Sequence, residues 1–201
     1  LLGHFQDLCH AVAFAHGRSV LHRDLKPQNV MVGELGETMV LDWGLAKHVK
    51  DSGEKESDEQ EDLIEGARAA DDLGDRERTV AGTSLGTPSY MSPEQARGDL
   101  AAVDERSDIW GLGAVLYEIL TGGPPYAGPT PEAIITQVLT EPVPAVRGRA
   151  PEAPAELAAV VEKALRKAKP DRYASAKDLA DEVTAFMTGR RVRAHTYRSL
   201  N

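Results

Sequence analysis

Two polar motifs that flank a short hairpin pattern constrain this 201-residue chain more than any other feature. The first motif reads His-Arg-Asp-Leu-Lys-Pro-Gln-Asn and ends at residue 29, and the second reads Asp-Trp-Gly and begins at residue 42. Between them, apolar runs at 30–32 and 39–41 are separated by a segment with two glycines, which favours a two-stranded hairpin. We therefore predict that residues 29 and 42 lie at the two ends of a hairpin that fixes their spacing.

Apolar residues at the helical period predict that most of the remaining chain is helical. The first such stretch begins at Leu1 and ends near Gly17, and an apolar helix that contains residues 109–119 should be central. Further amphipathic segments lie at 134–139, 157–165 and 179–186. The predicted fold class is therefore mainly α (α+β), with one small β-hairpin.

Composition excludes several classes of protein. The formal net charge of −9 argues against a general binder of nucleic acid or anionic membranes, because both need basic surface. Cys9 is the single cysteine, so no intrachain disulfide can form, and no apolar run reaches the roughly 18 residues that span a bilayer. The chain begins without Met or a signal-peptide pattern, so we expect a piece of a longer gene product in a reducing, aqueous compartment.

Charge is concentrated in one segment. Residues 51–78 hold twelve Asp or Glu against four Lys or Arg and show no sustained periodicity, which predicts a disordered, solvated insertion with a net charge of −8. Residues 188–201 contain several arginines and are expected to form a basic tail or linker.

The two polar motifs resemble the catalytic loop and the D-F-G motif of protein kinases. Downstream, residues 86–94 resemble the end of a kinase activation segment, with Ser-Pro-Glu where the family usually has Ala-Pro-Glu, and the run from Asp108 resembles the start of the family's central helix. The similarity covers residues 1 to about 187 and is greatest to bacterial, eukaryotic-like (Hanks-type) serine/threonine kinases. It implies a protein-kinase-like fold, with residues 1–187 as the C-lobe and 50–86 as the activation segment.

The resemblance implies a catalytic role for Asp24, Lys26 and Thr87. Asp24 would orient the substrate hydroxyl and take its proton, Lys26 would place a cation near the transferred phosphate, and Thr87 would hydrogen-bond both. Lys26, Asn29 and Asp42 would bind the cofactors ATP and Mg²⁺, with the amide oxygen of Asn29 and the carboxylate of Asp42 as metal ligands.

Other matching positions are expected to be structural or regulatory. His22 would pack beneath Trp43, which replaces the usual Phe, and Glu94 would pair with Arg172. Asp108 is interpreted either as a helix N-cap or as an anchor for the backbone of the catalytic loop. A second, regulatory group consists of Arg23, Thr79 and Thr83, because in the family an arginine before the catalytic Asp helps to bind an activating phosphate.

The chain contains neither the Gly-rich loop that covers ATP nor the V-A-I-K lysine and its glutamate partner. We therefore expect that the N-lobe is absent from this chain and lies upstream in the parent protein. The expected function is ATP-dependent phosphorylation of Ser or Thr on protein substrates in the cytoplasm, with further domains or a membrane anchor left open. The alternatives are a pseudokinase or scaffold, disfavoured by the intact polar motifs, and a small-molecule kinase, disfavoured by the segment 86–94.

Overall fold

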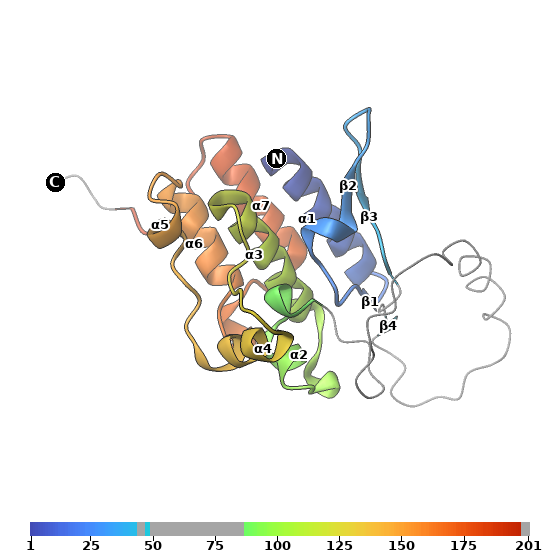
Figure 1. Cartoon of the computed structure of the whole chain (residues 1–201). Coiled ribbons are helices and arrows are strands. Elements are labelled where there is room, and N and C mark those ends of the chain that lie inside the picture. Colours follow the sequence, from blue (N-terminus) through green and yellow to red (C-terminus); the bar gives the residue numbers. More distant parts are fainter. Residues whose placement is uncertain (44–46, 49–86, 198–201) are drawn as a thin grey trace, which may run out of the picture.

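The computed structural model describes residues 1–43, 47–48 and 87–197. Within these ranges, a body of packed helices carries a small antiparallel hairpin on one side (Figure 1). In chain order, the helices and strands are α1 (Leu2–His16), β1 (Val20–Leu21), β2 (Val30–Val32), β3 (Thr38–Val40), β4 (Lys47–His48), α2 (Pro93–Ala96), α3 (Glu105–Thr121), α4 (Pro131–Thr140), α5 (Val146–Arg149), α6 (Ala155–Ala164) and α7 (Ala176–Met187). The mainly helical fold with one small hairpin is confirmed. The predicted insertion at 51–78 lies outside the described residues.

The hairpin has the predicted position. Strand β2 pairs antiparallel with β3, with Val30 opposite Val40 and Met31 opposite Met39. The backbone N–H of Leu41 also donates to the carbonyl of Asn29 at 2.8 Å, so the pairing continues past the strands. Asp42 follows Leu41 directly, and the hairpin therefore holds the ends of the two polar motifs side by side.

A second, smaller pairing was not predicted. Strand β1 precedes the first polar motif and β4 follows the second, and they pair antiparallel with Val20 opposite His48. Two residues are too few for a strand periodicity to be recognised in a sequence. The hairpin thus joins the end of the first motif to the start of the second. The pairing of β1 with β4 joins the segment before the first motif to the segment after the second.

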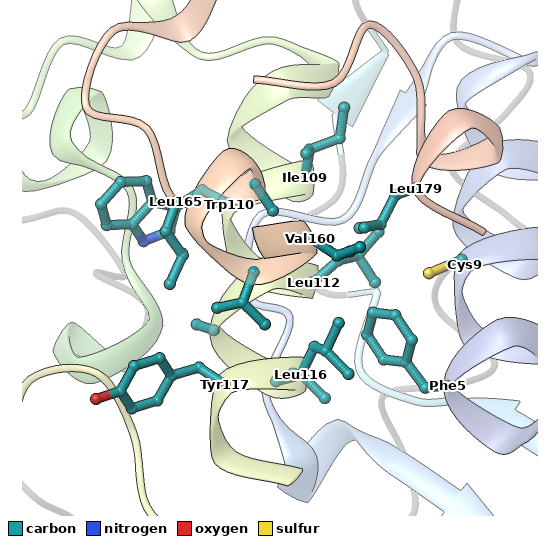
Figure 2. Packing of buried hydrophobic residues seen from close by; sticks show 14 of the residues in the cluster. Phe5, Cys9, Ile109, Trp110, Leu112, Leu116, Tyr117, Val160, Leu165 and Leu179 are labelled. Carbon is teal, nitrogen blue, oxygen red and sulfur yellow. The ribbon is translucent and has the colours of Figure 1, made fainter. Parts of the chain in front are cut away.

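Helix α3 is the central element. Most of its length is buried, and its side chains pack with those of α1, α6 and α7 (Figure 2). At Gly113, an added Cβ would lie 2.8 Å from the Cβ of Ala164, so glycine is what allows α3 to approach α6 this closely. The helix ends at Gly122, whose φ of +80° is the left-handed conformation that favours glycine. No helix in the described ranges is long and apolar enough to cross a membrane.

The interpretation of Asp108 as a helix N-cap needs correction. The N-cap of α3 is Asp104, which forms a capping box with Ser107, whereas Asp108 lies inside the first turn. Over its described part, the segment that follows α7 packs against the helices, and its role as a tail or linker stays a prediction. Val192 is buried in the core, and the carboxylate of Glu182 accepts hydrogen bonds from Nε of Arg193 and the N–H of Ala194. A single apolar residue among arginines carries no periodic signal, so the sequence pattern did not reveal this contact.

Candidate active site

Asp24 lies at the centre of a group of polar side chains that come from distant parts of the sequence. Nζ of Lys26 donates to its Oδ2 at 2.7 Å, and the backbone N–H of Thr87 donates to its Oδ1 at 3.0 Å. The amide nitrogen of Asn29 donates to the backbone carbonyl of Asp24 at 2.8 Å and to Oδ2 at 3.3 Å. Both carboxylate oxygens therefore have donors, and the orientation of the carboxylate is well defined.

Lys26 joins the two ends of this group. Its ammonium also donates to the hydroxyl of Thr87 at 2.9 Å, although Thr87 is 61 residues further along the chain. The short η4 helix (Pro88–Tyr90) begins directly after Thr87 and holds this residue against the loop. Asp24, Lys26 and Thr87, which the resemblance implied as one catalytic group, are thus in mutual contact.

The donors around Asp24 keep it ionised. Burial raises the pKa of this carboxyl, but the hydrogen bond and charge of Lys26, the N–H of Thr87 and the amide of Asn29 together outweigh burial, so the pKa of Asp24 is lowered. The side chain is therefore a carboxylate at neutral pH, and it can accept a hydrogen bond from a hydroxyl group.

His22 connects the two polar motifs. Its ring lies 4.6 Å, centroid to centroid, from the ring of Trp43, with the planes tilted by 56°. Nε2 lies 3.0 Å from the carbonyl of Leu41, while Nδ1 accepts from the N–H of Asp24 at 3.3 Å. Because a carbonyl can only accept and an N–H can only donate, this network requires the neutral tautomer with hydrogen on Nε2.

Asn29 and Asp42 provide oxygen atoms at neighbouring positions of the hairpin. Since the amide nitrogen of Asn29 donates to Asp24, its amide oxygen is the atom that could bind a metal ion. Asp42 is exposed and has a φ of +58°, a left-handed conformation that Asp tolerates better than most residues. Within the described ranges, no three His, Cys, Asp or Glu side chains gather into a metal-binding cluster. A metal at this site would therefore need a small number of protein ligands.

Asp108 holds the backbone of the loop that carries Asp24. Its Oδ2 accepts from the N–H of His22 and its Oδ1 from the N–H of Arg23, each at 2.8 Å. The second interpretation of Asp108, as an anchor of this backbone, matches these contacts. Oδ2 also accepts from Nε2 of His16 at 2.8 Å, which ties the end of α1 to the same carboxylate. Sequence reasoning missed His16 because its partner lies 92 residues away.

Arg23 has a backbone conformation that is rare for a residue with a side chain. Its φ is +70°, and its carbonyl accepts from the side-chain amide of Gln95 at 2.7 Å. Among the described residues, the buried Nε of Arg23 has no hydrogen-bond partner. Thr79 and Thr83, the two other residues with a predicted regulatory role, lie outside the described part of the chain.

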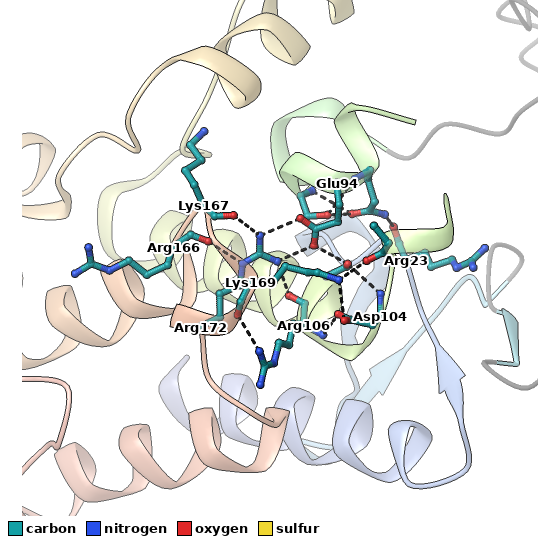
Figure 3. A network of polar contacts seen from close by, with 12 residues as sticks. Arg23, Glu94, Asp104, Arg106, Arg166, Lys167, Lys169 and Arg172 are labelled. Carbon is teal, nitrogen blue, oxygen red and sulfur yellow. Dashed lines mark hydrogen bonds and ion pairs between the residues drawn. The ribbon is translucent and has the colours of Figure 1, made fainter. Parts of the chain in front are cut away.

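Glu94 and Arg172 do form a buried ion pair, which lies in a network of polar groups beneath α2 (Figure 3). The hydroxyl of Ser107 donates to Oε1 of Glu94 at 2.7 Å. The network joins α2 to α3 and to the segment before α7, and it lies next to the loop that carries Asp24.

Comparisons with known proteins give a consistent result. The family described as protein kinase domain matches residues 3–186. The serine/threonine-protein kinase PknB of Mycolicibacterium smegmatis is 38% identical over 184 residues, which cover 91% of this chain and 25% of that protein. PknB of Mycobacterium tuberculosis is 36% identical over the same length.

A relative from another genus has a comparable identity. The serine/threonine-protein kinase PknD of Protochlamydia amoebophila is 36% identical over 192 residues, which cover 92% of this chain and 18% of that protein. The chain therefore spans a quarter or less of the length of these relatives.

Proposed function

The chain belongs to the protein kinase domain family, and on this premise we propose that it carries the catalytic loop of a serine/threonine kinase. The reaction transfers the γ-phosphate of ATP to Ser or Thr hydroxyls of protein substrates. The observation that carries this proposal is the contact group of Asp24, Lys26 and Thr87. It combines a carboxylate that can accept a proton with a cation at hydrogen-bond distance.

Asp24 acts on the nucleophile. Its ionised carboxylate accepts a hydrogen bond from the substrate hydroxyl, orients the oxygen and takes the proton as transfer proceeds. The lowered pKa supports this role, because a carboxyl group that was already protonated at neutral pH could not take the proton of the substrate hydroxyl. The three donors around it keep the carboxylate in one orientation, so little reorganisation is needed at the moment of reaction.

Lys26 supplies positive charge beside the nucleophile. Its ammonium is shared between Asp24 and Thr87, which holds it at the place where an incoming phosphate would carry negative charge. A lysine at this position in the family resembles the serine/threonine-specific class. Thr87 supports both side chains through its hydroxyl and its backbone N–H.

Asn29 and Asp42 would hold Mg²⁺. This ion prefers oxygen ligands, keeps several waters and usually takes only one or two carboxylates beside substrate phosphates. An amide oxygen and one carboxylate therefore fit it, and the lack of a larger acidic cluster in the described ranges does not conflict with such a site. When bound, the ion offsets negative charge on the phosphates of ATP.

A second lobe, upstream in the full-length protein, completes the nucleotide site. Two observations support this part of the proposal. The sequence lacks the Gly-rich loop and the lysine that hold ATP phosphates in kinases. On the hairpin beside the site, the cross-strand partners Met31 and Met39 are exposed, and exposed apolar groups that lie together mark surfaces that are covered by another part or ligand.

The site works on proteins in the cytoplasm, whether or not a membrane anchor exists elsewhere in the protein. The segment 86–94 supports a peptide substrate, because Thr87, which belongs to it, contacts Asp24. Arg23 supports control by phosphorylation, because a buried guanidinium nitrogen without a partner in the described ranges is a suitable donor to phosphate.

Analysis of the product tests the proposal. The full-length protein is incubated with Mg²⁺ and labelled ATP, once with a generic protein substrate and once with a set of small hydroxyl compounds, and the labelled amino acids are identified. We expect phosphoserine and phosphothreonine in the protein substrate, and no label with Asp24→Asn. Label that appears only in the small compounds would favour a small-molecule kinase, and ATP binding without any transfer would favour a scaffold.

A further inference from the structure

The peptide unit between Arg23 and Asp24 is held at both of its polar groups. Its N–H, which belongs to Asp24, donates to Nδ1 of His22 at 3.3 Å, and its carbonyl, which belongs to Arg23, accepts from Nε2 of Gln95 at 2.7 Å. Because a peptide unit is planar, the hydrogen bond to its oxygen also fixes the direction of the bond that leads into Asp24.

This peptide unit needs external support. Arg23 has a φ of +70°, which is unfavourable for a residue with a Cβ and persists only where neighbouring groups hold it. Oδ1 of Asp108, on α3, holds the N–H of Arg23, and Gln95, on α2, holds its carbonyl. Of these two anchors, Asp108 was expected from the sequence and Gln95 was not.

We propose that Gln95 is a positioning residue for phosphoryl transfer, which couples the orientation of Asp24 to the placement of α2. The inference rests on the proposed function, because it assigns Gln95 to the same catalytic group. Helix α2 follows shortly after Thr87, whose N–H holds the carboxylate of Asp24. Through Thr87 and Gln95, the segment that resembles the end of the activation segment contacts the side chain of Asp24 and the carbonyl of Arg23 directly before it.

Gln95 has a second structural role in α2, which can be distinguished from the proposed positioning role. Its Oε1 accepts from the N–H of Ser92 at 3.1 Å and from the hydroxyl of Ser92 at 2.9 Å, and the hydroxyl accepts from the N–H of Gln95. This is the capping box of α2. Since the carbonyl of Arg23 can only accept and the N–H of Ser92 can only donate, the amide can have only this orientation. Its oxygen therefore caps the helix, and its nitrogen binds the catalytic loop.

The substitution Gln95→Glu distinguishes the capping role of Gln95 from its positioning role. Gln95→Glu keeps an oxygen for the capping box, where Glu and Gln serve equally, but it removes the donor to Arg23. Gln95→Met has a similar volume and no charge, lacks the same donor, and provides a second variant if the carboxylate prevents folding. Ser175→Ala, which removes the cap of α7 far from the loop, is the matched control for a loss of stability alone.

The variants are made in the full-length protein, and kcat, KM for ATP and the melting temperature are measured. We expect Gln95→Glu and Gln95→Met each to lower kcat about tenfold, as the loss of one such hydrogen bond in a transition state allows, with KM for ATP changed less than about threefold. Gln95→Glu should melt only about 2–4 °C below the wild type, because it loses one hydrogen bond but keeps the capping box. Ser175→Ala should melt earlier and keep its kcat.

The pH dependence gives a readout that a structural role would not change. When the carboxyl group introduced by Gln95→Glu is protonated, its O–H can donate to the carbonyl of Arg23. The kcat of this variant relative to wild type should therefore rise as the pH is lowered from about 7 towards about 5, where the pH approaches the ordinary Glu pKa of about 4.3. An unchanged kcat in both Gln95 variants would overturn the inference, as would a loss of kcat that merely follows the melting temperature. If instead the wild type transfers no phosphate, or Asp24→Asn remains active, the proposed function fails and not only the role of Gln95.

Discussion

Arg172 binds the carboxylate of Glu94 through both terminal nitrogens of its guanidinium. Nη1 donates to Oε1 at 2.7 Å, and Nη2 donates to Oε2 at 3.0 Å. Its remaining donors bind the carbonyls of Arg106, Arg166 and Lys167. All five N–H groups of the guanidinium therefore have acceptors, although the side chain is buried. The two residues are 78 positions apart, so this contact fixes α2 relative to the segment between α6 and α7.

Breaking this pair should destabilise the protein strongly. Arg172→Met leaves a buried carboxylate and three part-buried carbonyls without this donor, so we expect a loss of about 3–5 kcal/mol in the free energy of unfolding. Arg172→Lys should recover only part of it, because an ammonium has three donors and no planar fork. The measurement is urea unfolding of each variant.

The control is an exposed ion pair of the same length. Lys177 and Asp181 are one helical turn apart on the surface of α7, with 2.7 Å between Nζ and Oδ2. Lys177→Met should change the free energy of unfolding by less than about 1 kcal/mol. If Arg172→Met and Lys177→Met lost equal free energy of unfolding, the stabilising role of the buried pair of Arg172 with Glu94 would be contradicted.

The same pair predicts how stability depends on acid. Burial raises the pKa of Glu94, but the hydrogen bonds and charge of Arg172, with Ser107, outweigh it and lower the pKa below its ordinary value of 4.5. A carboxyl whose pKa is lower in the folded state stabilises the protein above the unfolded pKa, and this contribution disappears as the pH falls through the folded pKa. The stability difference between wild type and Glu94→Gln should therefore be constant above pH 4.5 and shrink below it. A difference that grows in acid would show that the folded pKa is raised.

The sequence was most informative where chemistry and periodicity occur in short stretches. The long helices, the hairpin and the closeness of Asn29 and Asp42 all follow from local patterns. Such local patterns could not predict contacts between segments that are distant in the sequence. His16 and Asp108 meet only because α1 and α3 pack side by side, and nothing near Gln95 in the sequence indicates that it reaches the carbonyl of Arg23.

Other features were missed because several residues could serve the same purpose. Asp104 and Asp108 both precede or begin the apolar run of α3, and only the packing decides that Asp104 caps the helix and Asp108 binds the loop.

Thr87 was placed with Asp24 by resemblance alone, because a separation of 63 residues has no physical signature in the sequence.

Activation by phosphorylation at Thr79 or Thr83 is the third prediction. A phosphate adds about −1.5 to −2 charge and would pair with Arg23, whereas the segment 51–78, with its net charge of −8, would repel it unless the charges are screened by solvent over about 8–10 Å. Thr87 is not the switch, because its hydroxyl already binds Lys26. Mass spectrometry of the autophosphorylated full-length protein should find phosphate at one of the two positions. Thr79→Ala with Thr83→Ala should lower activity, and full activity without phosphate at 79–84 would place regulation elsewhere.

The isolated chain should be a poor enzyme. Its 201 residues contain the groups that we assign to the nucleophile but not the loop and lysine that hold ATP phosphates in kinases. Incubated with Mg²⁺, labelled ATP and a basic protein substrate, it should transfer little or no phosphate, whereas the full-length protein should be active. Turnover by the isolated chain that equals that of the full-length protein would show that no further lobe is needed.

The turnover of Asp24→Asn in the full-length protein, measured together with its affinity for Mg·ATP, tests the central assignment most directly. Asp24 is assigned to the nucleophile and Asp42 to the metal ion, so the two defects should separate. We expect Asp24→Asn to lower kcat by about 10²- to 10⁴-fold, as for the loss of a general base, while Mg·ATP affinity stays near that of the wild type. Asp42→Asn should chiefly weaken Mg·ATP binding. If Asp24→Asn weakened that binding as much as Asp42→Asn, or kept its turnover, the role assigned to Asp24 would be wrong.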